Sequence, residues 1–325
     1  MDRYPADTVV MLTTENGRAT DKYEPHDGGV TGTERVMVFG AGGFLGARIC
    51  ALLDDRGVEY RGLSRTRSEP YRRCDLAAMH PYALDTQIGM YKPTVIINAV
   101  GATLGEPAEL VRANVIAVEA LLASVRDNAG HARFVQLGSA AEYGGAPHGT
   151  SLDEQAAPRP LGPYGLTKLA GSELVLRAQR GGADAVVLRI FDVIGPGAPE
   201  STLTGRVIED LRSRHLIEVG SLDVWRDFVD VRDVAEAVLA VALADATLPP
   251  VLNVGTGRAT LARDVAGQLF ELSGQPATIL DDADQETALG APWQQADTTL
   301  IGEQLGWSPK IALDQSLADS WVSGQ

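Results

Sequence analysis

The chain is poor in cysteine and in positive charge. Its 325 residues include two cysteines, Cys50 and Cys74, whose spacing fits neither a disulfide framework nor a metal site. Lysine and arginine total 28 against 43 aspartates and glutamates, which gives a formal net charge of −15. Nucleic-acid backbones are bound by clustered Lys and Arg, so this balance argues against a nucleic-acid partner. We expect no metal site, and a reducing cytoplasm is the simplest setting for so few cysteines.

Long hydrophobic runs are also lacking. A membrane-spanning helix needs about 18 consecutive apolar residues, and the longest candidate, residues 238–244, has the length of a core helix. The first residues carry Asp2 and Asp7 and lack the apolar core of a signal peptide. The sequence therefore predicts a cytoplasmic protein without a membrane partner. With 45% hydrophobic residues, the chain is long enough for two domains or one enlarged α/β unit.

The chain does contain a glycine-rich turn between a predicted strand and a predicted helix. Residues 36–39 read Val-Met-Val-Phe, and Gly40, Gly43 and Gly46 follow at G-x-x-G-x-x-G spacing. Missing side chains at such a turn let a pyrophosphate approach the backbone, and the start of the next helix offers amide donors and positive partial charge. The pattern predicts a dinucleotide-binding site.

Apolar strands alternate with helices from Arg35 to Arg189. We predict strands at residues 36–39, 59–63, 94–98, 133–137 and 185–189, and helices ending near Asp55 and spanning about 82–90, 107–128 and 164–179. Continuous apolar strands separated by helices indicate a parallel sheet covered on both faces, the doubly wound α/β (Rossmann) fold. After Asp192 the rhythm loosens, with one helix near 204–213, which favours a smaller C-terminal substrate-binding domain.

The predicted organisation has three parts. Residues 1–34 are polar and form an N-terminal arm, in which Asn16-Gly17 is typical of a hairpin tip. Residues 35–190 form the dinucleotide-binding domain, with later contributions from about 226–256. Residues 191–325 mainly form the substrate-binding domain.

Tyr164 and Lys168 are four residues apart on a predicted helix, which stacks a phenol and an ammonium on one face. A phenol with a pKa of about 10 is a poor proton donor or acceptor at neutral pH. A neighbouring cation favours the phenolate, so the pairing predicts a lowered Tyr164 pKa and acid-base chemistry.

Together these motifs resemble the extended short-chain dehydrogenase/reductases, the group of NAD(P)-dependent nucleotide-sugar epimerases, dehydratases and reductases. The resemblance covers about residues 35–325. It depends on the glycine turn, on Tyr164 with Lys168, and on five further segments: 98–101 (NAVG), 137–144 (LGSAAEYG), 189–197 (RIFDVIGPG), 226–234 (RDFVDVRDV) and 253–257 (NVGTG).

The resemblance implies roles for particular residues. In the family, a hydroxyl at the Ser139 position hydrogen-bonds the reacting oxygen, the tyrosine exchanges a proton with it, and the lysine binds the nicotinamide ribose. Ser139, Tyr164 and Lys168 are thus the predicted catalytic residues. The predicted cofactor contacts are Gly40, Gly43, Phe44, Leu45, Gly46, Ser64, Arg65, Asp75, Leu76, Asn98, Ala99, Val100 and Lys168. The predicted substrate contacts are Ser139, Ala140, Ala141, Asp192 and Arg226.

The end of the second strand bears on the choice of cofactor. NAD-preferring sites place an acid there for the ribose 2′-hydroxyl, whereas a nearby Arg accommodates a 2′-phosphate. Here the strand runs into Leu63-Ser64-Arg65-Thr66-Arg67, with no acid. Arg65, with Ser64 or Arg67, favours NADP(H), and NAD stays the alternative.

The reaction type is open between two interpretations. Dehydratases of the group follow the active-site hydroxyl with an Asp-Glu pair, but Ala140 and Ala141 follow Ser139, which disfavours dehydration. Residues 217–228 and 138–144 are similar to GDP-4-keto-6-deoxymannose reductases, and an NADPH-leaning loop suits a reductase. A 4-epimerase that keeps its cofactor bound is the second interpretation. A dinucleotide sensor without turnover stays open as a function of a different class.

One position departs from the family. Asp192 stands where an Asn is usual, and a carboxylate near a substrate diphosphate would repel it unless protonated or paired. Arg226 is expected either to compensate by binding phosphate or to form a structural ion pair with Asp227 or Asp230.

The resemblance also implies a homodimer built from the helices before and after the fifth strand. The residues expected to contribute to it are Ala113, Ala117, Ala120, Leu121, Leu169, Leu174 and Leu176, with ordinary core packing as the other interpretation.

Overall fold

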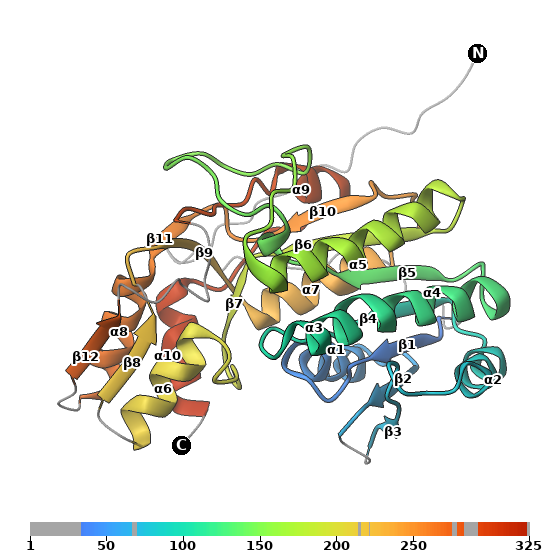
Figure 1. The fold of residues 1–325 in the computed structure, drawn as a ribbon, viewed down its shortest axis with the longest axis horizontal. Helices are drawn as coiled ribbons and strands as arrows, with labels where there is room; N and C mark the ends of the chain where they lie inside the picture. The colour runs from blue at the N-terminus through green and yellow to red at the C-terminus, as the bar shows by residue number, and fades with distance from the viewer. Residues whose placement is uncertain are drawn as a thin grey trace, which may run out of the picture. The chain divides into compact units, whose positions relative to one another are not determined.

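The protein is represented by a computed structural model that describes residues 34–66, 70–213, 216–220, 222–274, 278–282 and 292–323. These residues belong to one compact unit, Gly32–Gln325 (Figure 1). Residues 1–33 of the predicted N-terminal arm, which include its hairpin, lie outside the described residues. Among the helices that are described, none is long and apolar enough to cross a bilayer.

A seven-stranded sheet runs through the larger part of this unit, in the order β10-β6-β5-β4-β1-β2-β3. Every neighbouring pair in it is parallel. Its strands are β1 (Val36–Phe39), β2 (Tyr60–Ser64), β3 (Arg72–Arg73), β4 (Val95–Asn98), β5 (Arg133–Leu137), β6 (Ala185–Ile190) and β10 (Val251–Val254). This order confirms the predicted doubly wound α/β fold.

Both faces of the sheet are buried, as continuous apolar strands require. Along β1, Val36 and Val38 belong to one hydrophobic cluster, whereas Met37 and Phe39 belong to another. Side chains alternate between faces along a strand, so the two clusters are the two cores on either side of the sheet.

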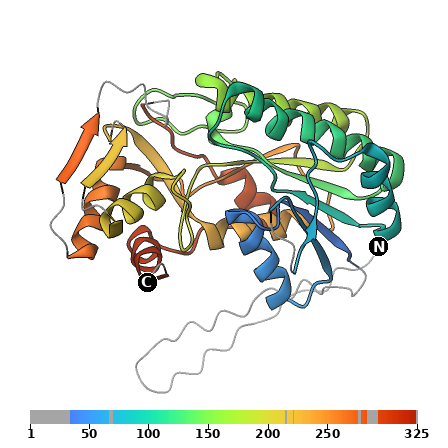
Figure 2. The same ribbon diagram turned by 60° about the horizontal axis from the view of Figure 1, so that its bottom comes forward.

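Helices cover the two faces. The helix α1 (Phe44–Asp55) packs against α7 (Val231–Ala242) on one face, whereas α2 (Pro81–Tyr91), α4 (Ala117–Asn128) and α5 (Gly162–Arg180) cover the other. Figure 2 shows α4 and α5, in green, across the sheet from the blue α1. The predicted helix 107–128 is formed by α3 (Pro107–Val111), a π-helical turn (Arg112–Ile116) and α4.

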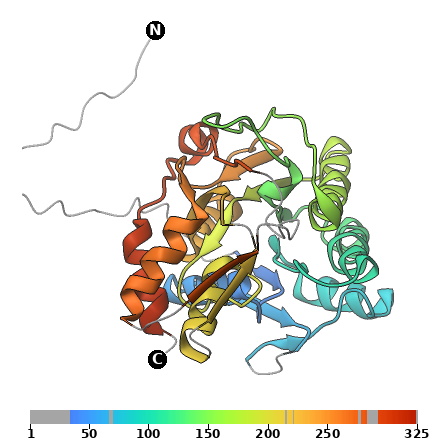
Figure 3. The ribbon, with the colours of Figure 1, turned by 60° about the vertical axis from the view of Figure 1, so that its left-hand side comes forward.

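In the smaller part, the described residues form two short sheets and three helices around a separate hydrophobic cluster. One sheet has the order β11-β9-β7 and the other pairs β12 with β8. The strands are β7 (Asp192–Ile194), β8 (Leu216–Gly220), β9 (Trp225–Asp230), β11 (Ala259–Leu261) and β12 (Thr278–Asp282), and the helices are α6 (Leu203–Ser213), α8 (Ala262–Ser273) and α10 (Leu313–Ser323). Figure 3 shows α8 and α10 side by side, and α9 (Thr299–Leu305) lies against β10.

The order of the strands positions the site. Strand β1 lies between β2 and β4, and the chain order reverses there. Ligands of open α/β sheets bind at the carboxyl ends of the strands at such a switch point. The glycine turn follows β1, residues 99–101 follow β4, and Ser139 follows β5, so the predicted motifs meet at one edge of the sheet.

Candidate active site

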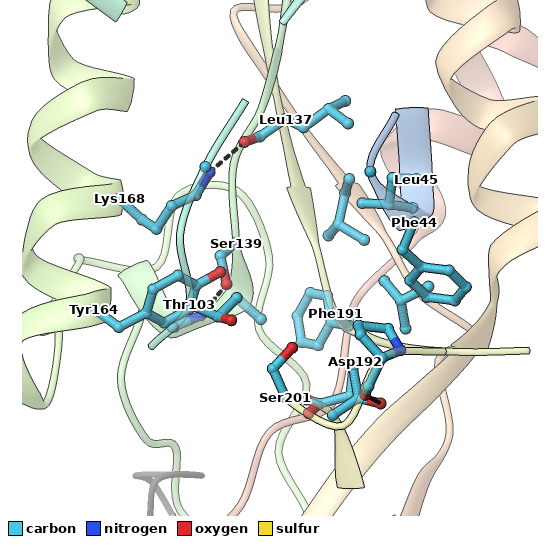
Figure 4. A pocket seen from close by; sticks show the side chains of 18 of the residues that line it. Phe44, Leu45, Thr103, Leu137, Ser139, Tyr164, Lys168, Phe191, Asp192 and Ser201 are labelled. Atoms are coloured by element: carbon cyan, nitrogen blue, oxygen red, sulfur yellow. Dashed lines mark hydrogen bonds between the residues drawn. The ribbon is translucent and has the colours of Figure 1, made fainter. Parts of the chain in front are cut away.

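A cavity of about 610 Å³ lies at the carboxyl ends of the parallel strands. Its walls are formed by the glycine turn, by the segments after β4, β5 and β6, by helix α5, and by the segment before α6 together with β9. The lining residues used below are Gly43, Phe44, Leu45, Gly46, Arg65, Ala99, Val100, Ser139, Ala140, Ala141, Tyr164, Lys168, Asp192, Ser201, Thr204, Arg226 and Gln294. Figure 4 shows ten labelled lining residues around this space.

The glycine turn is built by close backbone approaches. Gly40 has a φ of +84°, and a Cβ atom there would lie 2.7 Å from the Ala99 carbonyl carbon. A Cβ atom on Gly46 would lie 2.1 Å from the Gly40 carbonyl oxygen. Side chains at either position would push the α1 N-terminus away from the strands. Gly43, Phe44, Leu45 and Gly46 face the cavity, whereas Gly40 shapes the turn behind it.

Ser139 is fixed at the end of β5 by a capping arrangement. Its backbone amide donates to the Glu142 carboxylate at 2.9 Å, and its Oγ accepts from the Ala141 amide at 3.1 Å. The segment Ala140–Glu142 is a 3₁₀ turn with Ser139 as its N-cap. A short polar side chain at this position suits an N-cap, and here it also leaves the hydroxyl at the cavity wall.

Tyr164 lies next to Ser139 in the cavity (Figure 4). Burial raises the pKa of Tyr164 to about 12, the hydrogen bond with the Ser139 side chain lowers it, and the Glu142 and Asp192 carboxylates raise it. The direction is opposite to the lowering predicted from Lys168, because loss of water around the phenol outweighs the stabilisation of its anion. The structure thus brings the two oxygens together with the phenol in its neutral form.

Lys168 lies one helical turn after Tyr164 and is buried. Its Nζ donates to the Leu137 carbonyl oxygen at 2.5 Å, which holds the amine at the end of β5. Burial lowers the pKa of Lys168, and the Glu142 carboxylate raises it. All three predicted catalytic residues therefore line one cavity, and their roles stay predictions.

Glu142 holds the backbone of Ser139 in place and was not predicted as a site residue. Its carboxylate accepts from the Ser139 amide, from Ser172 Oγ at 2.8 Å and from Arg189 Nε at 2.9 Å. The Arg189 guanidinium also stacks over the Tyr143 ring, 4.4 Å from its centroid. A charged residue directly after Ala140-Ala141, in an otherwise apolar segment, was the available sequence signal.

Asn114 is a second residue that the sequence analysis missed. It lies in the π-helical turn and is buried, and its side chain exchanges two hydrogen bonds of 2.9 Å with the Ala102 backbone. Its amide also donates to Thr167 Oγ1 at 3.0 Å. Asn114 thus ties the segment after β4 to the helix that carries Tyr164 and Lys168. A single Asn in an apolar helical pattern could have indicated it.

Gln294 is a third missed residue. Its Nε2 donates to the carbonyl oxygens of Ala140, at 3.1 Å, and Gly144, at 2.6 Å. Ala140, Ala141 and Gln294 all line the cavity, so a segment near the C-terminus holds the turn that follows Ser139. Nothing in the local sequence around Gln294 indicated this long-range contact.

The predicted cofactor residues divide into two groups. Arg65, Ala99 and Val100 line the cavity together with the glycine turn, and no acid stands at the end of β2. Ser64, Asp75, Leu76 and Asn98 are not part of the cavity wall. Leu76 packs in the hydrophobic core, and the Asn98 amide donates to Gln136 Oε1 at 2.8 Å. Arg67 lies outside the described residues.

Asp192 and Arg226 both line the cavity, on β7 and β9. Arg226 Nε lies 3.9 Å from Asp192 Oδ2, with 1% of the Arg226 side chain and 28% of the Asp192 side chain exposed. Burial raises the pKa of Asp192 and the Arg226 guanidinium lowers it, while the Asp227 carboxylate raises it.

The two acids proposed as structural partners of Arg226 have other contacts. Asp227 accepts from the backbone amides of Thr256, Gly257 and Ala296. Asp230 forms an ion pair with Arg232 at 2.8 Å. Arg226 forms an ion pair with Asp192, and its Nη1 donates to the Trp225 carbonyl oxygen at 2.8 Å.

Curated proteins similar to this chain act on nucleotide sugars according to their names. A dTDP-6-deoxy-L-talose 4-dehydrogenase (NAD(P)(+)) from Kitasatospora kifunensis is 36% identical over 307 residues, covering 90% of this chain and 96% of that protein. A GDP-6-deoxy-D-mannose reductase from Pseudomonas aeruginosa is 28% identical over 301 residues, covering 88% and 95%. A UDP-glucose 4-epimerase from Rhizobium leguminosarum bv. trifolii is 28% identical over 325 residues, covering 89% and 96%.

Solved structures agree with the fold. MoeE5 in complex with UDP-glucuronic acid and NAD has a TM-score of 0.79 at 29% identity, covering 89% of this chain and 98% of that chain. RMD from Pseudomonas aeruginosa complexed with NADPH has a TM-score of 0.75 at 26% identity, covering 90% and 97%.

The model of the NAD dependent epimerase/dehydratase family matches residues 36–255, which include the glycine turn, Ser139, Tyr164, Lys168 and Arg226. This match confirms the resemblance to the extended short-chain dehydrogenase/reductases, and the protein is an NAD(P)-dependent enzyme. The chain belongs to the NAD dependent epimerase/dehydratase family.

Proposed function

We propose that the protein reduces a 4-keto group on a nucleotide-linked deoxysugar, with NADP(H) as cofactor and Tyr164 as proton donor. The observation that carries the proposal is the meeting of Ser139, Tyr164 and Lys168 with the glycine turn in one cavity. The names of the relatives support the substrate class, since one is called a 4-dehydrogenase of a dTDP-linked 6-deoxysugar and another a reductase of a dTDP-linked 4-dehydro-6-deoxysugar. These are the two directions of the same type of reaction.

Each of the three residues has a separate task. The Ser139 hydroxyl hydrogen-bonds the sugar oxygen that changes between keto and hydroxyl. Tyr164 gives that oxygen its proton during reduction and takes it back during oxidation, a contribution of about a hundred- to ten-thousandfold in rate. Lys168 holds the ribose next to the nicotinamide. When bound, the cofactor supplies or accepts the hydride.

Reduction is favoured over the other reactions of the family by two features of the wall. Ala140 and Ala141 carry no acid or base, so the proton transfers of dehydration have no donor there. Arg65 lines the cofactor end of the cavity, and none of the described residues at the end of β2, Ser64, Arg65 and Thr66, is acidic. This suits NADP(H) and thus a reductant that is exchanged at every turnover. NAD stays the alternative cofactor.

A 4-epimerase is the second candidate, because several relatives carry that name at up to 29% identity. An epimerase returns the hydride to the sugar it came from and keeps its cofactor bound. A dinucleotide sensor without turnover is the weakest candidate, since Ser139, Tyr164 and Lys168 are all present.

We assign residues 35–190 to dinucleotide binding, with contributions from about 226–256, and residues 191–325 mainly to substrate binding. Cytoplasmic localisation and a homodimer complete the proposal. Ala117, Leu121 and Leu176 pack in the core, so they are not available to a partner. Val111, Ile116 and Leu166 are the large apolar side chains exposed on the same helices, at 40%, 47% and 59%.

The test is a panel of dTDP-, GDP- and UDP-linked 4-keto-6-deoxysugars with NADPH or NADH, followed by loss of absorbance at the nicotinamide band. We expect oxidation of NADPH by at least one sugar, and loss of turnover with retained NADPH binding in Tyr164→Phe. Tightly co-purifying NAD(H) with interconversion of sugar epimers would instead establish the epimerase. Full activity of Tyr164→Phe would exclude the proposed mechanism.

A further inference from the structure

The charged side chains in the cavity wall divide between its two ends. Among the described lining residues they are Arg65, Lys168, Asp192 and Arg226. Arg65 lies with the glycine turn, and Lys168 is hydrogen-bonded to the Leu137 carbonyl. Asp192 and Arg226 are therefore the charged pair at the other end, where β7, β9 and the start of α6 meet.

This pair is looser than two other buried ion pairs among the described residues. Arg226 Nε and Asp192 Oδ2 are 3.9 Å apart, too far for a hydrogen bond between them. By comparison, Arg189 Nε lies 2.9 Å from Glu142, and Arg232 lies 2.8 Å from Asp230. Both residues line the cavity, with 28% of the Asp192 side chain and 1% of the Arg226 side chain exposed.

A buried hydroxyl stands at the same end. Thr204, at the start of α6, is 0% exposed, and among the described residues its Oγ1 has no hydrogen-bond partner. Buried polar atoms are normally paired, so a site that leaves one open in its wall suits a polar ligand. Ser201 adds a second hydroxyl, and Figure 4 shows it with Asp192.

Resting on the proposed function, we infer that Asp192 couples substrate binding to proton uptake. The diphosphate of a nucleotide sugar replaces the Asp192 carboxylate as the anion next to Arg226. The carboxylate takes one proton from solvent and stays as a neutral acid that donates a hydrogen bond to a phosphate oxygen. No bond of the substrate changes in this step.

The electrostatics give the direction of the effect. A carboxylate and a diphosphate repel each other in a partly buried site, and a protonated carboxyl does not. Burial already raises the pKa of Asp192, and the main opposing influence is Arg226, which the diphosphate would engage. Two other ionisable groups lie close to Asp192. The Asp227 carboxylate, on β9, raises the pKa of Asp192, whereas Tyr164, on α5, is a neutral phenol.

Two consequences follow for affinity. Between the pKa of Asp192 in the free site and its higher pKa in the complex, the Kd for the nucleotide sugar rises by up to about tenfold per pH unit, since one proton is bound. Nucleotide sugars therefore bind more tightly at low pH, where Asp192 is protonated, and more weakly at high pH, where Asp192 is ionised. Asp192→Asn, which is always neutral, removes this dependence.

The experiment is calorimetric titration of the NADPH-loaded enzyme with dTDP-, UDP- and GDP-glucose from pH 5 to 9. These sugars already carry a C4 hydroxyl, so the reduced cofactor permits no turnover. Their phosphates are diesters, which avoids the terminal phosphate that titrates with a pKa of about 6. Repeating each titration in two buffers of different ionisation enthalpy gives the number of protons taken up.

We expect the wild type to take up a fraction of one proton, rising to a maximum within this range, and Asp192→Asn to take up none. The variant should bind at least about tenfold more tightly than the wild type at pH 9, and the difference should become smaller as the pH falls towards 5. Asp223→Asn, which removes an exposed acid of the same part of the fold that pairs with Arg263 at 3.0 Å, is the matched control and should behave as wild type.

Equal proton uptake in wild type and Asp192→Asn would overturn the inference, as would weaker binding of the variant at every pH. Retained NADPH binding in the variant separates these outcomes from misfolding. If none of the three sugars binds while NADPH does, the proposed substrate class itself is wrong.

Discussion

The ammonium nitrogen of Lys168 lies 2.5 Å from the backbone carbonyl oxygen of Leu137. This hydrogen bond fixes the amine at the end of β5 and directs it to a neutral acceptor instead of the Tyr164 phenol. The phenol is correspondingly held in its protonated form, since burial raises the pKa of Tyr164 to about 12. Tyr164 is therefore present as the neutral phenol, which is the protonation state from which a proton donor in ketone reduction must start.

Because Tyr164 is a neutral phenol, kcat should depend on pH differently for oxidation and for reduction of the sugar. During oxidation Tyr164 must be ionised, and below a pKa of about 12 the ionised fraction rises about tenfold per pH unit. We expect kcat for oxidation of a nucleotide-linked 6-deoxysugar to increase from pH 6 to 9, whereas kcat for reduction stays nearly constant. The measurement is kcat at saturating sugar, because binding has a pH dependence of its own.

Asp192→Asn is the control for that profile, since it removes the titration assigned to substrate binding and keeps Tyr164. The increase of kcat with pH should persist in this variant. A flat oxidation profile in both proteins would show that ionisation of Tyr164 does not limit the reaction.

The buried ion pair between Glu142 and Arg189 is expected to contribute to stability. Glu142→Ala would leave Arg189, with 3% of its side chain exposed, without its carboxylate, which costs about 3–5 kcal/mol. Glu142→Gln keeps an acceptor for the Ser139 amide and should cost less. Urea unfolding followed by circular dichroism measures both. Asp127→Ala breaks an exposed pair with Arg126 and should leave the midpoint unchanged.

An unchanged midpoint in Glu142→Ala would mean that Arg189 finds another partner. Activity adds a second observable, because Glu142 also holds the Ser139 amide. Glu142→Gln is therefore expected to fold and to retain turnover better than Glu142→Ala.

Local patterns predicted the parallel sheet well and the substrate end poorly. The predicted bounds of β1 and β5 agree with the structure, because a buried parallel strand is a continuous apolar run with turn residues at its ends. Strand β7 has three residues and owes its place to pairing with β9, a contact that no local pattern specifies. The π-helical turn at Asn114 likewise depends on the packing of α5 against it.

The candidate site follows the same division. Gly43, Gly46, Tyr164 and Lys168 were predicted from their spacing along one strand-turn-helix segment or one helix, and Ser139 was predicted from the resemblance to the family. Gln294 was missed, since its contacts with Ala140 and Gly144 join segments about 150 residues apart. The lowered pKa predicted for Tyr164 was wrong because spacing gives the nearest cation but not the depth of burial.

Cofactor choice is testable at Arg65. We expect Arg65→Ala to raise KM for NADPH by roughly ten- to a hundredfold, because a charged hydrogen bond to the 2′-phosphate is lost. KM for NADH should stay unchanged. Arg56→Ala removes an exposed arginine that pairs with Glu236 and should change neither. A parallel rise for both cofactors would show that Arg65 acts on the turn and not on the 2′-phosphate.

The proposed homodimer is testable through two exposed apolar residues. Ile116, in the π-helical turn, and Leu166, on α5, are 47% and 59% exposed, so charged substitutions there do not disturb the core. In Ile116→Glu with Leu166→Glu, like charges brought together across a two-fold interface would separate the subunits. We expect light scattering to give the dimer mass for the wild type and the monomer mass for the variant. Met90→Glu, 79% exposed on α2, should remain dimeric, and a monomeric wild type at micromolar concentration would refute the dimer.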